Sequence, residues 1–156
     1  MELISDFNTF LFNGNIDAAG RLLERGIDIN KKEENGNYAM SAAINSDNPE
    51  VLNFIIRNGA DVNLKMDNGT TGLHIAIDCA IDGMIQNNRE EPYQEAMQMI
   101  KMLLDNGADL TIKDTDGETA LDVINTYSGN ITGFNFLKDI FRTIIPDIDN
   151  RISFNK

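Results

Sequence analysis

The sequence predicts an all-α solenoid, in which helix–turn–helix units stack side by side and are joined by short β-hairpin loops. One five-residue phrase occurs three times, starting at Gly26, Gly59 and Gly107, and a second glycine follows each of these ten residues later. The two steps between the phrases are 33 and 48 residues long. Recurrence at a period of this size is typical of stacked repeats rather than of a globular enzyme domain.

The phrase divides the 156 residues into four units of a single domain, 1–156. In each of the first three units an apolar cluster ends the second helix, and the glycine that follows fits the left-handed position at a helix C-terminus. A strand-like piece such as Ala60-Asp61-Val62-Asn63 comes next, and a hairpin tip such as Asp67-Asn68-Gly69 leads into the following helix. The expected units are approximately 1–32, 33–65, 66–113 and 114–146, with a tail at 147–156.

The two ends of the chain are modified, as a stack of repeats requires for its outer faces. At the N-terminus, a helix expected over Leu3–Phe12 carries an apolar stripe and has no preceding hairpin. At the C-terminus, a second stripe runs over 134–145, and we expect Pro146 to stop that helix. We interpret the second stripe as a capping helix, with a docking patch for a partner as the alternative. Ile152 and Phe154 are expected either to fold back onto this end or to belong to a disordered tail.

The third unit resembles the ankyrin repeat. Its run Gly69-Thr70-Thr71-Gly72-Leu73-His74-Ile75-Ala76 follows the family pattern Gly-x-Thr-Pro-Leu-His-x-Ala, except that Gly72 stands where proline is usual. The resemblance extends over nearly the whole chain. It implies that His74 has a structural role, bridging backbone groups of adjacent repeats. It also implies that partners meet the concave face, which the hairpin tips and the first helix of each unit form.

The longer step marks an insertion of 15 residues in the third unit, near 78–95. We expect the first helix of this unit to continue for about two turns, followed by a polar loop and a second helix that begins near Tyr93. Insertions in solenoids fall on loops, often on one working face. Two interpretations stay open, a protrusion that contacts a partner and a tolerated insertion that folds back on the stack. The candidate contact residues of the protrusion are Met84, Gln86, Asn87, Arg89, Glu90 and Tyr93.

The composition is strongly acidic, with 25 Asp and Glu against 13 Lys and Arg and a net charge of −12. Such a surface repels nucleic acid and anionic membranes and suits a basic protein partner, with solubility as the alternative role of the charge. No stretch approaches the roughly twenty apolar residues that span a bilayer. The N-terminus lacks the basic and apolar regions of a signal peptide. We therefore expect a cytoplasmic protein that is monomeric when free.

Residues for catalysis or metal binding are few. His74 and Cys79 are the single histidine and the single cysteine of the chain, so no zinc site of the usual composition can form. The run Asp114-Thr115-Asp116-Gly117 fails the register of a calcium loop, because Ile112 and Val123 occupy its first and twelfth ligand positions. No phosphate-binding glycine loop and no nucleophile motif occurs. We expect no cofactor, no metal and no enzymatic activity, and we interpret Cys79 as an inert core thiol.

The surface therefore carries the functional prediction. An acidic concave face flanked by lysines would speed the encounter with a basic partner, and Tyr38 and Met66 are the expected apolar anchors. The concave-face residues predicted to contact the partner are Glu33, Glu34, Asn35, Asn37, Tyr38, Asn45, Met66, Asp67, Asn68, Thr70, Asp78, Asp114, Thr115, Asp116 and Glu118.

The composition, rich in Asn, Ile, Asp and Met, is typical of an AT-rich genome and favours a bacterial origin. Small acidic ankyrin proteins of bacteria often resemble immunity proteins. By that analogy we predict an immunity-type protein that binds and neutralises a cognate basic toxin such as a nuclease. The alternative is a regulatory inhibitor or adaptor of a cellular enzyme, including a viral or effector protein that acts in a host cell.

Overall fold

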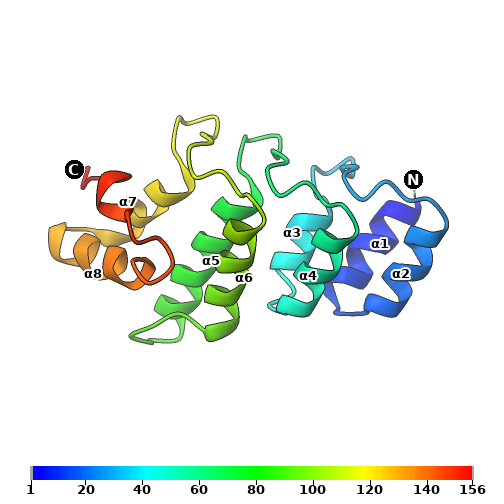
Figure 1. Cartoon of the computed structure of the whole chain (residues 1–156), viewed down its shortest axis with the longest axis horizontal. Helices are drawn as coiled ribbons and strands as arrows, with labels where there is room; N and C mark the ends of the chain where they lie inside the picture. Colours follow the sequence, from blue (N-terminus) through cyan, green and yellow to red (C-terminus); the bar gives the residue numbers. More distant parts are fainter. Residues whose placement is uncertain (1, 156) are drawn as a thin grey trace.

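The protein is a row of helix pairs with loops projecting along one edge (Figure 1). The structure is a computed structural model that describes residues 2–155. Over that range it contains helices and turns but no strand, apart from an isolated antiparallel bridge between Lys113 and Thr119. The predicted all-α solenoid is confirmed.

The helices follow one another in pairs. The first three pairs are α1 (Glu2–Phe12) with α2 (Ile16–Glu24), α3 (Ala39–Ile44) with α4 (Pro49–Arg57), and α5 (Gly72–Gln86) with α6 (Gln94–Asp105). The last pair is α7 (Val123–Ser128), preceded by the 3-10 helix η1 (Ala120–Asp122), with α8 (Ile131–Phe141). A second 3-10 helix, η2 (Ile148–Asn150), lies in the C-terminal segment. In Figure 1, α8 lies across the direction of the other helices.

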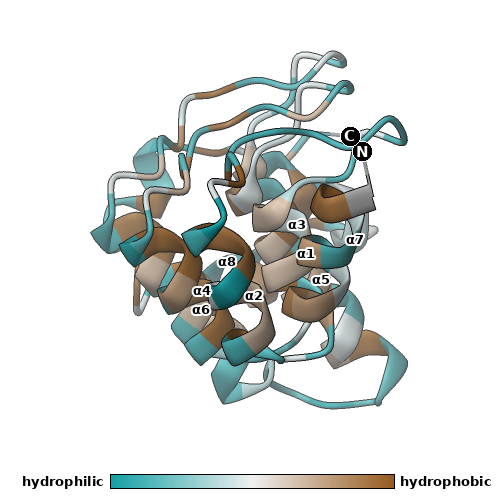
Figure 2. Cartoon of the chain, turned by 90° about the vertical axis from the view of Figure 1, so that its right-hand side faces the viewer, coloured by the Kyte–Doolittle hydropathy of each residue, from teal (hydrophilic) through white to brown (hydrophobic). Residues whose placement is uncertain are grey.

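The pairs stack in two layers around one core. Helix α1 packs on α3, α3 on α5, and α5 on η1 and α7, while α4 packs on α6 in the second layer. Figure 2 shows the layers end-on, with the loops extending beyond the helix ends at the top. Buried apolar side chains from Ile4 in α1 to Ile152 in the C-terminal segment belong to one continuous cluster. Burial of this apolar surface provides the main stabilisation, because no unit could bury its own faces alone.

The recurring phrase forms a turn that links consecutive units. The strand-like piece predicted at 60–63 is not a strand: Asp61 Oδ1 accepts from Asn63 N at 2.9 Å, and Asp61 O accepts from Leu64 N at 3.2 Å. The local side-chain bond competes with ladder pairing and favours the turn. Asn63 then reaches into the next unit, where Nδ2 donates to Gly107 O at 3.0 Å and Oδ1 accepts from Asp109 N at 2.8 Å. Asn30 makes the same two bonds one unit earlier, so the phrases form a ladder of side-chain bridges.

Three hairpin loops, at 33–37, 66–70 and 114–118, follow these turns. Each is closed by one backbone bond between its first and last residue, with N–O distances of 2.7, 2.8 and 2.9 Å respectively. They form the projecting edge in Figure 1. The second and third loops touch, because Thr115 N donates to Asn68 O at 3.0 Å.

The insertion lengthens one helix pair. Helix α5 has 15 residues where α3 has 6, and α6 begins at Gln94, as expected. The connecting loop at 87–93 lies at the ends of the helices opposite the hairpin loops (Figure 1). Ile81 and Met84, in the added turns of α5, are buried in the core. The helical part of the insertion thus folds onto the stack, while its loop stays exposed.

The C-terminal stripe ends differently from the prediction. Helix α8 buries Phe134, Leu137 and Phe141 but ends at Phe141, before Pro146. Ile144 N donates to Phe141 O in the i→i−3 pattern of a 3-10 turn, which tightens the end of the helix, and Ile145 N makes a last i→i−4 bond to the same oxygen. The residue before a proline also disfavours the α conformation.

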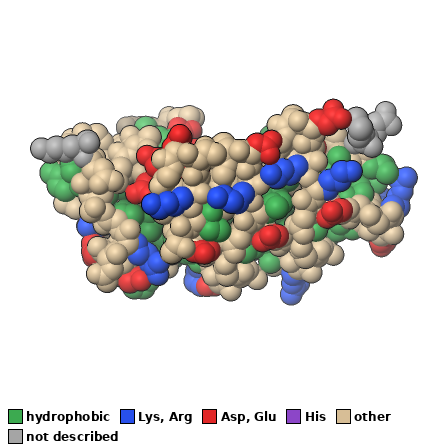
Figure 3. All heavy atoms as spheres, turned by 90° about the horizontal axis from the view of Figure 1, so that it is seen from above, with side chains coloured by type: hydrophobic (Ala, Val, Ile, Leu, Met, Phe, Trp, Pro, Cys, Tyr) green, Lys and Arg blue, Asp and Glu red, His purple; other side chains and the backbone are tan. Residues whose placement is uncertain are grey.

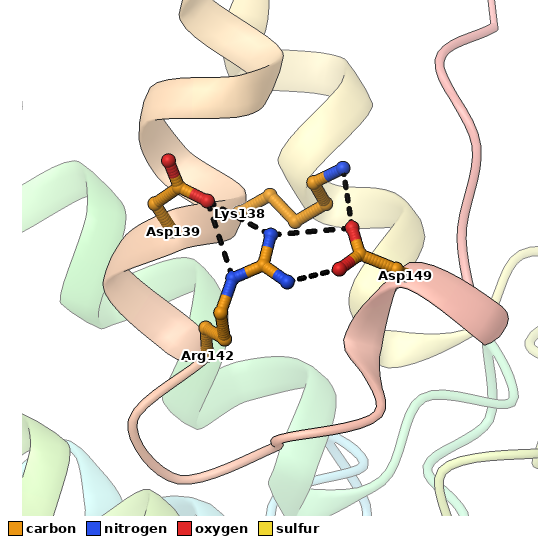
Figure 4. Close-up of polar contacts among 4 residues, drawn as sticks. All are labelled: Lys138, Asp139, Arg142 and Asp149. Atoms are coloured by element: carbon orange, nitrogen blue, oxygen red, sulfur yellow. Dashed lines mark hydrogen bonds and ion pairs between the residues drawn. The ribbon is translucent and has the colours of Figure 1, made fainter.

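The C-terminal segment folds back onto α8, so the fold-back interpretation is confirmed. Asp149 pairs with Lys138 at 2.7 Å and with Arg142, which also binds Asp139 at 2.9 Å (Figure 4). The rings of Phe134 and Phe154 lie 5.6 Å apart. Hydrogen bonds from Arg142, then from Lys138, lower the pKa of Asp149 to about 2.

Candidate functional site

A groove lies where α3, α5 and α7 meet the second and third hairpin loops. Its volume is about 380 Å³, which is enough for one or two side chains of a partner. We call it the central groove. Its lining residues are Asn37, Ser41, Asn45, Met66, Asn68, Thr70, His74, Ile75, Asp78, Asp114, Glu118, Thr119 and Val123.

His74 joins α5 to the third hairpin loop, two elements that line the central groove. Its Nδ1 accepts from Thr71 N at 3.1 Å, just before the start of α5. The proton therefore lies on Nε2, which donates to Glu118 O at 3.3 Å in the third hairpin loop. The bridging role that the sequence resemblance implied for His74 is thus present, and it holds the groove in one geometry before any partner arrives.

The charged side chains that line the central groove are all acidic. Asp78, Asp114 and Glu118 line it, and no lysine or arginine of the described chain does. Asp114 Oδ1 accepts from Asp116 N at 2.9 Å and from Glu118 N at 3.0 Å, so this carboxylate also holds its loop together. Asp78 Oδ1 accepts from the Tyr127 hydroxyl at 3.0 Å. Burial, followed by the contact with Asp78, raises the pKa of Tyr127 to about 12.

The outer edge of the hairpin loops is mixed in charge. Figure 3 looks down on this edge and shows lysine or arginine side chains in a row among acidic ones. Lys65 Nζ donates to Lys113 O at 2.8 Å, and Lys32 pairs with Asp67 at 3.2 Å. The lysines therefore bridge neighbouring loops, whereas the carboxylates inside the central groove have no such counter-charges in its lining.

Two predicted contact residues are wrong because the core uses them. Tyr38 is only 1% exposed, and its hydroxyl donates to Leu64 O at 3.0 Å. Burial, followed by the nearby Asp61 charge, holds its pKa above the usual range. Met84 is 3% exposed, because it lies on the inner face of α5. Neither side chain can act as an anchor for a partner.

A second groove, of about 370 Å³, runs beneath the first hairpin loop between α1 and α3. We call it the N-terminal groove. It is lined by Ser5, Asn8, Thr9 and Phe12 of α1, by Glu33, Asn35 and Asn37 of the loop, and by Ser41, Ala42 and Asn45 at α3. The central groove shares Asn37, Ser41 and Asn45 with it, so the two form neighbouring parts of one face.

The predicted concave-face residues divide among these sites. The central groove contains Asn37, Asn45, Met66, Asn68, Thr70, Asp78, Asp114 and Glu118, and the N-terminal groove adds Glu33 and Asn35. Those that line neither groove are Glu34, Tyr38, Asp67, Thr115 and Asp116. Residues that the sequence reasoning missed include Ser5, Asn8, Thr9 and Phe12. Their helical spacing on α1 was a usable signal, since i, i+3, i+4 and i+7 share one face.

The insertion contributes to a third groove, of about 600 Å³, at the opposite ends of the helices from the hairpin loops. Gln86, Asn87 and Tyr93 line it, whereas Arg89 lies over the Tyr93 ring at 4.2 Å. Cys79 is half-buried in the same groove. Burial, then the charges of Asp78, Asp47 and Asp82, raises the pKa of Cys79 to about 11. The thiol is therefore protonated and unreactive at neutral pH. The expected core position is wrong, because Cys79 is half-buried and lines this groove.

No group of three or more His, Cys, Asp or Glu residues within 2–155 is arranged to hold a metal ion. None of the helices in that range is long and apolar enough to cross a membrane.

These features define a solenoid repeat protein with a preformed, rigid face. A family model described as "Ankyrin repeats (3 copies)" matches residues 9–88, and the model for a single ankyrin repeat matches residues 68–115. The chain belongs to the ankyrin-repeat family, whose repeats are protein–protein interaction modules.

Solved structures agree on the fold. The chain is similar to the ankyrin repeat domain of Bcl-3, which is described as a unique member of the IkappaB protein family. The TM-score is 0.60 at 22% sequence identity, and the match covers 74% of this chain and 44% of that one. No curated protein sequence matches the chain.

Proposed function

We propose that the protein is a non-enzymatic binding module that holds a basic protein partner in the central groove. The observation that carries this proposal is the lining itself, to which the described residues contribute three carboxylates and no lysine or arginine. Cations of a partner would form charge-assisted hydrogen bonds there. The net charge of −12 would add long-range attraction for the same kind of partner.

The groove requires little reorganisation on binding. His74 and Asp114 fix the third hairpin loop, and Thr115 fixes it to the second. A preformed site avoids part of the ordering cost of association. We also propose that the protein is monomeric and cytoplasmic and that it binds its partner directly, without a cofactor. It should not bind nucleic acid.

The specific role that we propose is immunity, in which the protein neutralises a cognate basic toxin. The acidic groove and the acidic composition support this choice. The alternative is a regulatory inhibitor or adaptor of a cellular enzyme, including a viral or effector protein in a host cell. The exposed insertion residues Gln86, Asn87, Arg89, Glu90 and Tyr93 are a second candidate contact surface for either role.

Affinity capture with a matched pair of variants tests the proposal. Glu118→Lys reverses a charge in the central groove, whereas Asp116→Lys makes the same change two residues away, outside it. A captured basic protein should bind the Glu118→Lys variant about tenfold more weakly or worse and the Asp116→Lys variant almost normally. Raised salt should slow association with the wild type.

Other results would redirect the proposal. Equal losses in the two variants would show that overall charge, not the groove, controls binding. Retention of only acidic partners with salt-independent affinity would contradict the proposed basic partner. Inhibition of the captured protein's toxic activity separates immunity from an adaptor role, since an adaptor would leave that activity unchanged. Tyr93→Ala tests the insertion separately, because Tyr93 is 41% exposed and its loss need not disturb the core.

A further inference from the structure

The N-terminal groove contains a buried acceptor that the folded chain leaves without a donor. Asn8, on α1, is 5% exposed. Its Nδ2 donates to Glu33 Oε1 at 2.6 Å. The amide cannot be turned over, because that would bring two oxygens together. Asn8 Oδ1 consequently has no hydrogen-bond partner within residues 2–155. Such an acceptor destabilises a folded chain. Because the atom is closed off from solvent, a ligand supplies the missing donor only when the side chains beside it move apart.

The carboxylate beside this amide also lacks a counter-charge. Glu33 Oε1 accepts from Asn8, and Oε2 accepts from Asn35 Nδ2 at 3.2 Å. Lys32 forms its ion pair with Asp67. Lys31, two residues before Glu33, lines an adjoining pocket that also contains Glu33, but it forms no ion pair with that carboxylate within residues 2–155. Among residues 2–155, no lysine or arginine lines the groove. Two neutral amides therefore satisfy the carboxylate, and in the described chain no cation does.

An aromatic side chain lies at the other end of the same groove wall. Phe12 is 55% exposed and lies one helical turn beyond Asn8 on α1. Residues four apart on a helix are about 5–6 Å apart on one face. The groove thus offers Asn8 with its partner Glu33 of the first hairpin loop and, one turn further along α1, the exposed ring of Phe12.

We infer that the N-terminal groove takes an arginine side chain of the protein partner, with its guanidinium group at Glu33 and Asn8 and its stem across Phe12. The inference rests on the proposed protein-binding function and adds a second contact beside the central groove. A guanidinium group carries five N–H donors in one plane, so it can serve acceptors on two residues at once. It also stacks on aromatic rings, whereas a lysine ammonium is compact and strongly hydrated.

The test uses the full chain labelled with nitrogen-15 and three small probes. N-acetyl-arginine N-methylamide should shift the Asn8 side-chain amide and the backbone amides of 33–37 in a saturable way. The citrulline analogue, a neutral isostere, should bind about tenfold more weakly, since it lacks the charge. Free L-arginine should bind no more tightly than the capped probe. Absence of a saturable shift, or equal binding of the citrulline probe, would overturn the inference. Tighter binding of free arginine would overturn the assignment to a protein side chain.

Two variants and a control locate the effect. Glu33→Gln keeps the acceptor for Asn8 and removes the charge, so the arginine probe should bind about tenfold more weakly. Glu34→Gln makes the same change at the next residue, outside the groove, and should leave probe binding unchanged. Should Glu33→Gln fail to fold, Phe12→Ala remains informative, because an exposed side chain is removed there. It should weaken the arginine probe more than the citrulline probe, and an equal effect on both would count against stacking.

The experiments can overturn the arginine inference and the proposed protein-binding function independently of each other. A protein partner that depends on Glu118, together with no probe response at Asn8, would overturn this inference alone. A clear arginine response at Asn8 with no protein partner retained would leave the groove chemistry intact and contradict the proposed function.

Discussion

Gly72 occupies a helix start at which a larger side chain would collide with the preceding helix pair. A Cβ atom built on Gly72 would lie 2.7 Å from Met40 Cγ and 3.3 Å from Ile44 Cδ1. The family pattern has proline at this position. The sequence therefore showed that Gly72 departs from the pattern, but it did not show why. The reason is the neighbour: Met40 fills the space that the proline ring would need, and it is 1% exposed.

Gly72→Ala should therefore destabilise the protein even though alanine favours helices. We expect a loss of about 1–3 kcal/mol from overpacking against Met40. Gly20→Ala is the control, because a Cβ on Gly20 in α2 would meet only Phe54 Cζ at an ordinary 3.9 Å. That change should raise stability by up to about 1 kcal/mol. Urea unfolding of both variants checks this, and a stabilised Gly72→Ala would refute the packing explanation.

For two side chains, the sequence pattern gave the wrong prediction of whether the side chain is exposed. Tyr38 precedes α3 and Met84 lies in an added turn of α5, and both were predicted as surface contacts. The position of Tyr38 beside a polar hairpin tip gave no sign that its ring turns inward toward Leu64 O. Met84 follows Ala80 at helical spacing, and this placed it on the buried face. Residue type and neighbourhood alone do not reveal which way a side chain at the edge of an element points.

At the scale of elements, the hairpin loops differ in how tightly their neighbours hold them. Gly69 and Gly117 occupy the same place in successive loops, with positive φ of 80° and 81°. A Cβ on Gly69 would lie 2.9 Å from Asp114 Cα, whereas a Cβ on Gly117 would meet nothing within 4 Å. The second loop is thus enclosed by the third, while the third has an open side.

Alanine at the two positions should separate backbone strain from crowding. Gly117→Ala should cost about 1–2 kcal/mol, because an L residue is strained in the left-handed region. Gly69→Ala should cost about 1–3 kcal/mol more, because it also pushes on the Asp114 backbone. Thermal or urea unfolding gives both values. Equal losses would mean that the loops move apart freely, and the central groove would then be less rigid than its hydrogen bonds indicate.

The C-terminal segment is a separate element held by charge. Hydrogen bonds from Arg142 and Lys138 keep the pKa of Asp149 at about 2, below its ordinary value. A carboxylate with a lowered pKa stabilises the fold above its unfolded pKa of about 4, and this contribution is lost as the pH falls toward 2.

Asp149→Asn should therefore lower stability at pH 7, and its difference from the wild type should shrink between about pH 4 and pH 2. Asp105→Asn serves as the control, because Asp105 makes a single exposed pair with Lys101 within α6 and should matter little. Unfolding curves at several pH values provide the measurement. A pH-independent difference would show that Asp149 acts through packing instead of charge.

At the scale of the whole molecule, the units are joined by the ladder of asparagine bridges as well as by the core. The sequence predicted the helix pairs, the lengthened α5 and the end helices, because spacing and periodicity encode them locally. It also predicted eight residues of the central groove. It missed the N-terminal groove, which forms only when α1 meets a loop that lies 25 residues away, as between Asn8 and Glu33. The sequence also predicted lysines beside these loops, but not that Lys65 and Lys32 would bridge neighbouring loops.

Removing one bridge should weaken the stack as a whole. Asn63→Ala deletes both bonds to the next unit and should cost about 1–2 kcal/mol. Thr111→Ala is the matched control, because its hydroxyl bonds only to Asp109 Oδ1 within its own turn, at 2.7 Å. Chemical denaturation compares them. A smaller loss in Asn63→Ala than in Thr111→Ala would contradict a role for the ladder in joining units.

The ladder of asparagine bridges stops at the third phrase. The third phrase carries threonine where Asn30 and Asn63 carry the first two bridges, and Thr111 hydrogen-bonds back to its own turn. Beyond it, the C-terminal segment occupies the end of α8, where a further unit would have to stack. Adding a repeat would therefore require two changes at once, an asparagine at 111 and release of Asp149 from Lys138 and Arg142. The series of bridges thus stops at a side chain that bonds only within its own turn, and the segment after α8 turns back over the last described helix pair.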